Sequence, residues 1–427
     1  MSRVKGKRMN RRQFLRRTAV TVGGLMAAPT IITTSALGAG AVRVAASERI
    51  VVGCLGYGGR AGHVLNVFLG QPDVQVVGIC DVKRPRRELG KKTVDKKYGN
   101  QDCKTYLDMY EILAREDIDA MLVATGDYWH SPAACITARA GKDMYCEKPL
   151  SVSISESRAV SDTMKRFGRI FQCGTQRRSV DQFVFAMDIA RRGLLGEMKA
   201  VYAEKAPWWR EPYETRLPAE PEPPKEEFWW DRWLGAALWR PYNKTYASRS
   251  FWGGHWDFAG GSITEWGSHT VDLCQYAVDA DDTSPVEYWQ EGKDIHARYA
   301  NGVKLILTEP IGRGSCGVRF EGTEGWIEVD DSGRVAVEPK SLRPTHGLGR
   351  GYPVDNHVRN FLDCVKTRQQ PVAPAEGAHR SITACHAANI CFRLGRPVKW
   401  DPIKEEFIGD EEANRLRTRA YREPWRV

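Results

Sequence analysis

Short apolar runs rich in β-branched residues alternate with helix-compatible segments over the first part of the chain. The runs are Ile50–Val52, Val74–Cys80, Ala120–Thr125, Asp143–Cys146 and Ile170–Cys173. Between them, Tyr106–Leu113, Ser131–Ala140 and Ser155–Arg166 are predicted helices. Buried strands that alternate with helices are typical of a parallel sheet covered by helices on both faces. The pattern therefore predicts a doubly wound α/β domain over residues 47–173.

The pattern changes after about residue 174 and predicts a second domain over residues 174–400. Two strand-like runs, Ile295–Ala300 and Val303–Leu307, flank Asn301-Gly302, which is a strong two-residue hairpin signal. Further strands are expected at 318–320 and 326–329, and amphipathic helices at 356–366 and 378–393. We expect an α/β domain with an open, largely antiparallel sheet, followed by a polar surface tail over residues 401–427.

The first 46 residues are predicted to be an export leader. Residues 1–40 contain eight Lys or Arg and no acidic residue, and they include the apolar run Ala19–Leu37. Arg11-Arg12, in the string RRQFL, is a twin-arginine pattern. The leader predicts export by the twin-arginine route to a periplasmic or extracytoplasmic location, with cleavage between Gly38 and Ala46. An uncleaved membrane anchor is the alternative.

The charge of the remaining chain argues against a nucleic-acid partner. The formal net charge is +10, and residues 1–40 supply eight of these charges, so that residues 41–427 carry only +2. After removal of the leader we expect no membrane contact. The eleven cysteines form no C-x-x-C pair and no metal-ligand spacing with histidine, which predicts buried free thiols and no metal site.

A glycine-rich turn follows the first predicted strand. Residues 56–61, Gly56-Tyr57-Gly58-Gly59-Arg60-Ala61, fit the dinucleotide-binding pattern G-x-G-x-x-G/A. Gly56 permits the tight turn, Gly58 lets the backbone approach a pyrophosphate, and Ala61 lets the following helix pack on the strand. The free N–H groups at the start of that helix would bind the anion. The turn predicts a bound nicotinamide dinucleotide.

Asp81, at the end of the second predicted strand, favours NAD over NADP. A carboxylate at this place binds the adenosine ribose diol, although Asp81 could also cap the next helix. NADP stays possible because a cluster of basic residues that could hold a 2′-phosphate follows at once. The cluster consists of Lys83, Arg84, Arg86 and Arg87.

With two further motifs, the chain resembles the Gfo/Idh/MocA oxidoreductases, the family of glucose–fructose oxidoreductase and the inositol dehydrogenases. The motifs are CEKPL at residues 146–150 and GGSITEWGSH at residues 260–269, with Asp272 behind it. The resemblance runs from about Arg49 to Trp400. It implies an NAD(P)-dependent oxidoreductase that acts on a secondary hydroxyl of a sugar or cyclitol, in a homo-oligomer.

By this resemblance Lys148 lies beside the nicotinamide and hydrogen-bonds the reacting hydroxyl. The family's other catalytic pair matches Glu265 and His269, whose spacing of four places them on one helix face. Histidine exchanges protons near neutrality, which suits an acid/base role for His269. The family usually has Asp at the position of Glu265, so Glu265 either takes part in catalysis or only orients the substrate.

The resemblance also implies the other contacts of the site. The expected cofactor contacts beyond the glycine turn and Asp81 are Thr125, Asp127, His130, Glu147 and Lys148. The expected substrate contacts are Gln176, Arg178, Trp266 and Asp272. Residues 207–256 hold eight of the fourteen tryptophans, among them Trp208, Trp209, Trp229, Trp230, Trp233 and Trp239, interleaved with arginines such as Arg210. Such a mixture suits sugar stacking or a subunit interface.

Three functions remain open from the sequence. The first is an NAD(P)-dependent oxidoreductase whose Lys148 and His269 remove the hydroxyl proton during hydride transfer. The second is a redox-neutral glycosidase or epimerase that acts through a keto-sugar and uses the same residues. The third is a non-enzymatic sugar-binding protein. Because free nicotinamide nucleotide is scarce outside the cytoplasm, we expect the protein to fold around its cofactor and to retain it tightly.

Overall fold

The computed structural model describes residues 44–205, 214–345, 347–349 and 353–427. Residues Ile50–Val427 form one compact unit, and the described residues 44–49 do not belong to it. Within the latter, the structure describes a short 3₁₀ turn, η1 (Ala46–Glu48). Residues 1–43, with the twin-arginine pattern, lie outside the described residues. Across the described ranges, no helix combines the length and apolar character needed to cross a bilayer.

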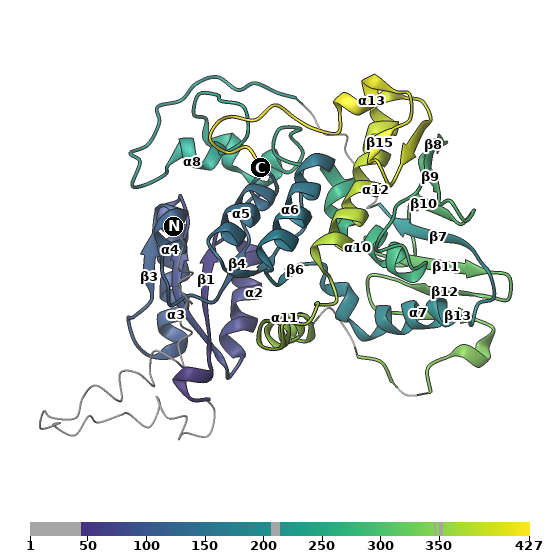
Figure 1. Ribbon diagram of the computed structural model, residues 1–427, viewed down its shortest axis with the longest axis horizontal. Coiled ribbons are helices and arrows are strands. Elements are labelled where there is room, and N and C mark those ends of the chain that lie inside the picture. The colour runs from purple at the N-terminus through teal and green to yellow at the C-terminus, as the bar shows by residue number, and fades with distance from the viewer. Residues whose placement is uncertain (1–43, 206–213, 346, 350–352) are drawn as a thin grey trace, which may run out of the picture. The chain divides into compact units, whose positions relative to one another are not determined.

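The first sheet consists of six parallel strands. They are β1 (Ile50–Leu55), β2 (Val74–Cys80), β3 (Lys104–Tyr106), β4 (Ala120–Val123), β5 (Asp143–Cys146) and β6 (Phe171–Cys173). Their order is β3-β2-β1-β4-β5-β6, so that the chain winds outward in both directions from the centre (Figure 1). The central strands are continuous buried runs, as is usual where helices cover both faces of a sheet. The doubly wound fold predicted for this region is confirmed.

Five helices alternate with these strands: α2 (Gly59–Gly70), α3 (Arg84–Tyr98), α4 (Met109–Leu113), α5 (Asp127–Arg139) and α6 (Ile154–Phe167). Two predicted boundaries are wrong. Tyr106 ends strand β3, whose side chains are largely exposed at the sheet edge and therefore leave no apolar pattern in the sequence. Helix α5 begins at Asp127 instead of Ser131, which places Asp127 in the first helical turn at the carboxyl edge of the sheet.

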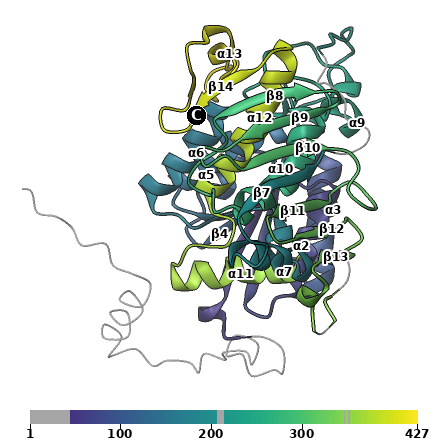
Figure 2. The same cartoon turned by 90° about the vertical axis from the view of Figure 1, so that its right-hand side faces the viewer.

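The second sheet has nine strands in the order β13-β12-β11-β7-β10-β9-β8-β14-β15, seen face on in Figure 2. They are β7 (Met198–Glu204), β8 (Glu287–Glu291), β9 (Asp294–Arg298), β10 (Lys304–Thr308), β11 (Val318–Gly322), β12 (Trp326–Val329), β13 (Val335–Glu338), β14 (Val398–Asp401) and β15 (Glu406–Phe407). Strands β7 and β10 pair in parallel, and the other described pairs are antiparallel. The predicted open, largely antiparallel sheet is confirmed.

The helices and 3₁₀ turns of the second half are η2 (Gln176–Ser179), α7 (Asp181–Arg191), α8 (Trp230–Leu234), η3 (Lys244–Ala247), α9 (Arg249–Trp252), α10 (Gly261–Ala277), η4 (Lys340–Leu342), α11 (Asp355–Thr367), α12 (Ala375–Leu394) and α13 (Glu411–Arg415). Helix α10 packs against β7 and α12, and α12 packs against α6 (Figure 1). Helix α11 returns to the first sheet, where Phe361 contacts the rings of Phe68 and Tyr145. The first domain is thus completed by a segment from the far end of the chain.

A segment that we call the strap, residues 225–252, lies against the first domain (Figure 1). The N–H of Trp229 donates to the Val82 carbonyl at 3.1 Å, and the N–H of Arg84 donates to the Glu227 carbonyl at 2.9 Å. On the strap's inner side, the Tyr128 hydroxyl donates to the Trp233 carbonyl at 2.7 Å. These bonds join the strap to the ends of β2 and α5.

The tryptophans of the strap form a core of their own. Trp230 and Trp233 stack with ring centroids 4.8 Å apart, and both are buried. Stacking covers only one face of each ring, and Trp233 lines the cavity described below, so sugar stacking by this pair stays a prediction. Trp239 is exposed. Trp208, Trp209 and Arg210 lie outside the described residues.

Candidate active site

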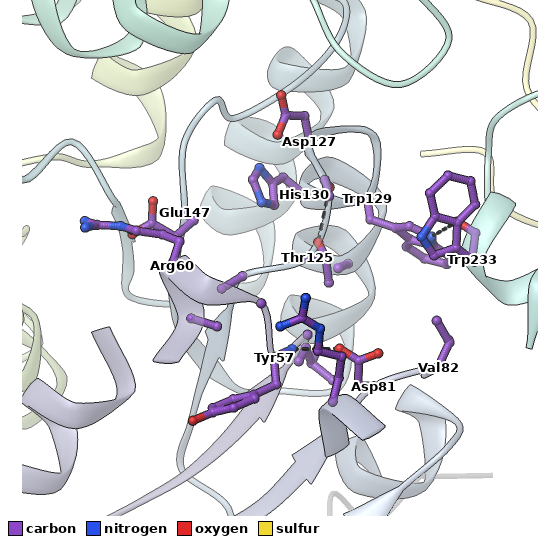
Figure 3. Close-up of a pocket in the computed structure, with 18 of the residues that line it drawn as sticks. Tyr57, Arg60, Asp81, Val82, Thr125, Asp127, Trp129, His130, Glu147 and Trp233 are labelled. Atoms are coloured by element: carbon purple, nitrogen blue, oxygen red, sulfur yellow. Dashed lines mark hydrogen bonds and ion pairs between the residues drawn. The ribbon is translucent and has the colours of Figure 1, made fainter. Parts of the chain in front are cut away.

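A cavity of about 620 Å³ lies at the carboxyl edge of the first sheet. Its walls come from the glycine turn, from the segments after β2, β4 and β5, from the strap with its helix α9, and from Glu265 of α10. In Figure 3, Asp81 and Val82 lie at one end and Asp127 and His130 at the other. This edge is where ligands bind in open α/β sheets. The volume lies within the range of small-molecule sites.

The glycine turn has the geometry that a dinucleotide requires. Gly56 has a φ of 81°, and a Cβ atom there would lie 2.7 Å from the Ala124 carbonyl oxygen, so a side chain is excluded. A Cβ atom on Gly58 or Gly59 would meet nothing within 4 Å, which leaves room beside the backbone. Helix α2 starts at Gly59 without a side-chain cap. Its first N–H groups are therefore available to a pyrophosphate.

Asp81 lies where the ribose of an adenosine would bind. One carboxylate oxygen accepts from the N–H of Tyr57 and the other from the N–H of Lys83, both at 2.8 Å. Burial raises the pKa of Asp81, and these two N–H groups and the positive charge of Lys83 oppose that effect. Each oxygen keeps a free lone pair that can accept from a diol hydroxyl.

The basic cluster after Asp81 is largely engaged elsewhere. The Lys83 ammonium donates to the Ala247 carbonyl at 3.2 Å, and Arg84 forms ion pairs with Glu88 and Glu227 at 2.7 Å. Arg87 donates to the backbone carbonyls of Asp81 and Glu226. Arg86 is the member of the cluster that lines the cavity besides Lys83. The free diol acceptor and the engaged cations fit NAD better than NADP.

The middle of the cavity is held by an ion pair between the two sequence motifs. The Arg60 Nε atom lies 2.9 Å from Oε1 of Glu147, and this Glu side chain is 3% exposed. The other carboxylate oxygen of Glu147 has no hydrogen-bond partner among the described residues. Thr125 and His130 line the same wall, and Nδ1 of His130 lies 2.7 Å from the Pro149 carbonyl oxygen. Nε2 of His130 is buried with no partner in the described part of the chain, and burial lowers the pKa of this histidine to about 4.

At the far end, Lys148 and Glu265 lie together as the resemblance implied. The Lys148 ammonium donates to Oε1 of Glu265 at 2.8 Å and to the Glu265 carbonyl at 3.0 Å. Arg249, from α9, pairs with Oε2 of Glu265 at 2.8 Å. Burial alone would raise the pKa of Glu265, but Lys148 and Arg249 outweigh it and lower the pKa to about 2. Glu265 is therefore a fixed negative charge between two cations.

His269 lies one turn further along α10, behind Glu265. It is 3% exposed and does not line the cavity, and no described residue forms a hydrogen bond with its Nδ1 atom. Burial, and then the positive charges of Arg177, Lys148 and Arg60, lower its pKa well below the ordinary value. A neutral imidazole is thus present at physiological pH, and the expected titration near neutrality does not hold for this environment.

The predicted substrate contacts lie outside the cavity lining. Arg178 donates to both carboxylate oxygens of Asp272, at 2.6 and 2.8 Å, and both side chains are 2% exposed. The two residues are thus joined in the protein interior. Gln176 is buried with its Oε1 atom unpartnered, and the Trp266 ring centroid lies 5.7 Å from the Lys148 ammonium. Of these four residues, Trp266 is the one placed beside the catalytic lysine by a contact.

Arg249 and Trp252 are two of the cavity residues that no sequence motif predicts. Arg249 and Trp252 lie on α9, within the strap, and their side chains stack with the guanidinium 4.3 Å from the ring centroid. No motif surrounds them, and they reach the cavity through the path of the strap. Asp127 was expected as a cofactor contact, and it lines the end of the cavity that holds Lys148 and Glu265.

Comparison with known families covers most of the chain. A family model described as an oxidoreductase family with an NAD-binding Rossmann fold matches residues 49–175. A second model, for the C-terminal α/β domain of an oxidoreductase family, matches residues 188–427. The two matches coincide with the two sheets of the structure.

Individual proteins give the same result. The scyllo-inositol 2-dehydrogenase (NAD(+)) of Bacillus subtilis is 32% identical over 383 residues, which cover 82% of this chain and 96% of that protein. An α-N-acetylgalactosaminidase of Shewanella oneidensis is 26% identical over 220 residues, which cover 47% of each chain. A crystal structure of an aldose-aldose oxidoreductase from Caulobacter crescentus, complexed with glycerol, has a TM-score of 0.59 and 18% identity, and the match covers 82% of this chain and 99% of that one. At that identity the structure supports the fold alone.

Proposed function

The chain belongs to the Gfo/Idh/MocA oxidoreductase family, and from this premise we propose that it oxidises a secondary hydroxyl of a sugar or cyclitol with a tightly held NAD. The observation that carries the proposal is the Lys148–Glu265 ion pair at 2.8 Å, at the far end of a cavity that begins at the glycine turn. A proton-donating group is thereby fixed where the nicotinamide end of a dinucleotide would lie.

The residues divide the work of the proposed reaction. Gly56–Ala61 and Asp81 would hold the cofactor, with Thr125, His130 and Glu147 along the same wall. When bound, NAD accepts a hydride from a carbinol carbon. Lys148 would donate a hydrogen bond to the reacting oxygen, and Glu265 orients this ammonium. His269, as a neutral imidazole behind Glu265, is proposed to contact the substrate through a change of its own rotamer or through water.

Retention of the cofactor is proposed from the position of the strap. Arg232, Trp233, Ala247, Arg249 and Trp252 all lie on the strap and line the cavity opposite the glycine turn. A dinucleotide between these two walls would leave only after the strap had moved. Such retention fits the proposed twin-arginine export, because a protein that folds around its cofactor carries it to the periplasm. We extend the proposal to a homo-oligomer, as the family resemblance implies.

The similarity to an α-N-acetylgalactosaminidase favours a second candidate, a redox-neutral glycosidase or epimerase. A cofactor that does not exchange has to be regenerated in place. Return of the hydride to the product is one way to do this, and a second substrate is another. The two candidates use the same cavity and differ in whether reduced cofactor accumulates.

One experiment separates the candidates. The purified mature protein is passed through gel filtration, denatured, and the released nucleotide identified by mass spectrometry. NAD in near-stoichiometric amount is the expected result, and a protein without nucleotide that also fails to bind added NAD would overturn the proposal. The loaded protein is then mixed with scyllo-inositol, myo-inositol and nitrophenyl glycosides. Reduced nicotinamide absorbance indicates a dehydrogenase, whereas nitrophenol release without that absorbance indicates the redox-neutral candidate.

A further inference from the structure

Asp127 is a buried carboxylate that lines the cavity without a side-chain partner. It is 5% exposed and lies at the same end as Lys148, Glu265 and Arg249 (Figure 3 shows its place beside His130). Within the described ranges, no side chain forms a hydrogen bond or ion pair with this carboxylate, which accepts only from its own backbone N–H. A buried carboxylate without a cationic partner costs stability, so its presence in a cavity indicates a functional group.

The other groups at this end are already engaged. Each carboxylate oxygen of Glu265 lies in an ion pair, one with Lys148 and one with Arg249, and these cations lower its pKa to about 2, which makes it a poor base. In its ion pair the Lys148 ammonium donates hydrogen bonds and has no lone pair with which to accept a proton. His130 lies on the Pro149 carbonyl, and His269 does not line the cavity. Of these groups His130 faces the cavity with a free nitrogen, Nε2, but burial lowers its pKa to about 4, which makes it a weak base near neutral pH.

The surroundings of Asp127 place its titration in the useful range. Burial, and then the negative charge of Glu265, raise the pKa of Asp127 to about 7, while Arg249 and Lys148 oppose the rise. These three groups face Asp127 from α10, α9 and the turn after β5, and His130 lies one turn away on α5 itself. A base is most effective when its pKa is close to the working pH.

We propose that Asp127 is the catalytic base that takes the proton of the reacting hydroxyl while Lys148 holds the oxygen. The inference rests on the oxidation of a secondary alcohol proposed above. The C–H bond breaks and its electron pair passes as a hydride to NAD, which is reduced. The O–H electrons form the C=O bond, and the proton passes to a carboxylate oxygen of Asp127. When a hydride is returned to the carbonyl carbon, the same carboxylic acid supplies the proton.

The test compares Asp127→Asn with the unaltered mature protein. Each is loaded with NAD and mixed with scyllo-inositol or myo-inositol. Asparagine keeps the shape and cannot accept the proton, so we expect the rate of nicotinamide reduction to fall about a hundredfold to ten-thousandfold. The rise of this rate with pH around pH 7 should disappear, and the dissociation constant for NAD should stay unchanged. Asp188→Asn, an exposed carboxylate on α7, is the matched control and should leave all three measurements unchanged.

Two results would overturn the inference. In the first, Asp127→Asn weakens NAD binding and leaves the rate at saturating NAD unaltered, which makes Asp127 a cofactor contact alone. The second is measured by infrared spectroscopy of the loaded protein. We expect a protonated carboxyl band that vanishes as the pH rises through about 7 and that is missing in Asp127→Asn. Absence of this band in the unaltered protein contradicts the inference. If neither polyol reduces the cofactor, the proposed function fails for these substrates while the infrared result still decides the state of Asp127.

Discussion

Glu265 and Asp272 lie two turns apart on helix α10, and each forms an ion pair with a basic residue from another element. Asp272 is sealed in the interior, where Arg178 and the Ser381 hydroxyl satisfy both of its oxygens. Glu265 is 26% exposed at the cavity wall, beside a carboxylate that has no side-chain partner within the part of the chain that the structure describes. One helix thus carries a closed pair that supports the fold and an open pair that is available to a ligand.

The difference shows what separates a structural ion pair from a functional one. Burial alone would lower the pKa of the Arg178 guanidinium, but Asp272 and Asp281 outweigh it and raise the pKa. Each guanidinium nitrogen of Arg178 donates to an acceptor, and one of these acceptors is the Val372 carbonyl. At Glu265 two cations, Lys148 and Arg249, face two carboxylates, and the net charge changes near neutrality because the pKa of Asp127 is raised to about 7. The functional pair is marked by the cavity beside it and by a neighbouring carboxylate, Asp127, that no described side chain bonds.

The largest expected effect is on stability, from Asp272→Asn. The change leaves Arg178 buried with a single remaining carboxylate, Asp281, and breaking a buried pair in this way costs about 3–5 kcal/mol of the free energy of unfolding. Urea denaturation of the NAD-free protein measures the loss. The double variant Arg178→Met with Asp272→Leu should recover most of it, since an apolar pair of similar volume is close to neutral. NAD affinity of the folded fraction should not change, and a change would place Asp272 in the site after all.

Glu265→Gln should give the opposite profile. The amide keeps the shape but removes the charge that orients Lys148, so we expect nicotinamide reduction to slow about a hundredfold. The free energy of unfolding should fall by only about 1 kcal/mol, because the pair borders a cavity that water can enter. Glu412→Gln, at an exposed ion pair with Arg396, is the control and should change neither quantity. A large loss of stability without loss of rate would make Glu265 equivalent to Asp272.

The smallest expected effect is the pH dependence of that stability difference. The folded-state pKa of Glu265 is lowered to about 2, so its contribution is present above the unfolded pKa of about 4.3 and is lost as the pH falls through about 2. The gap in unfolding free energy between the unaltered protein and Glu265→Gln should therefore close on acidification. Asp127, with a pKa raised to about 7, has the opposite sign: its ionisation costs stability as the pH rises from about 4 to 7. Urea midpoints measured from about pH 2 to about pH 7 check both slopes.

The sequence was informative wherever the chemistry is local. The glycine turn, Asp81 and the Lys148 motif could be predicted because each lies at the end of a buried strand, and the topology of a parallel sheet brings such ends together. Strand β3 was missed because its exposed residues follow no apolar pattern. Helix α11 was expected in the second domain, and its return to the first sheet depends on the packing of Phe361 against distant rings.

The site residues show the same limit. Arg249 could not be predicted, since only the path of the strap brings it to Glu265. The sequence does not show that Glu265 reaches the cavity and Asp272 the interior. The direction in which each residue of α10 points depends on how α12 packs on this helix. The role proposed for Asp127 depends on its having no side-chain partner among the described residues, which a sequence does not reveal. Long-range packing therefore decided which motif residues reach the cavity.

The eleven cysteines are all free and all buried, and they lie in the first sheet, in helices α5, α10, α11 and α12, and in the segments before β3 and β11. Burial raises the pKa of the Cys146 and Cys274 thiols well above the ordinary value, which keeps them as unreactive thiols in the folded chain. Alkylating reagents can reach these sulfurs only when the surrounding structure opens. The alkylation rate of each thiol, measured by mass spectrometry of its peptide, therefore reports how often that part of the molecule unfolds. The decrease of this rate with bound NAD measures how far the cofactor slows the opening.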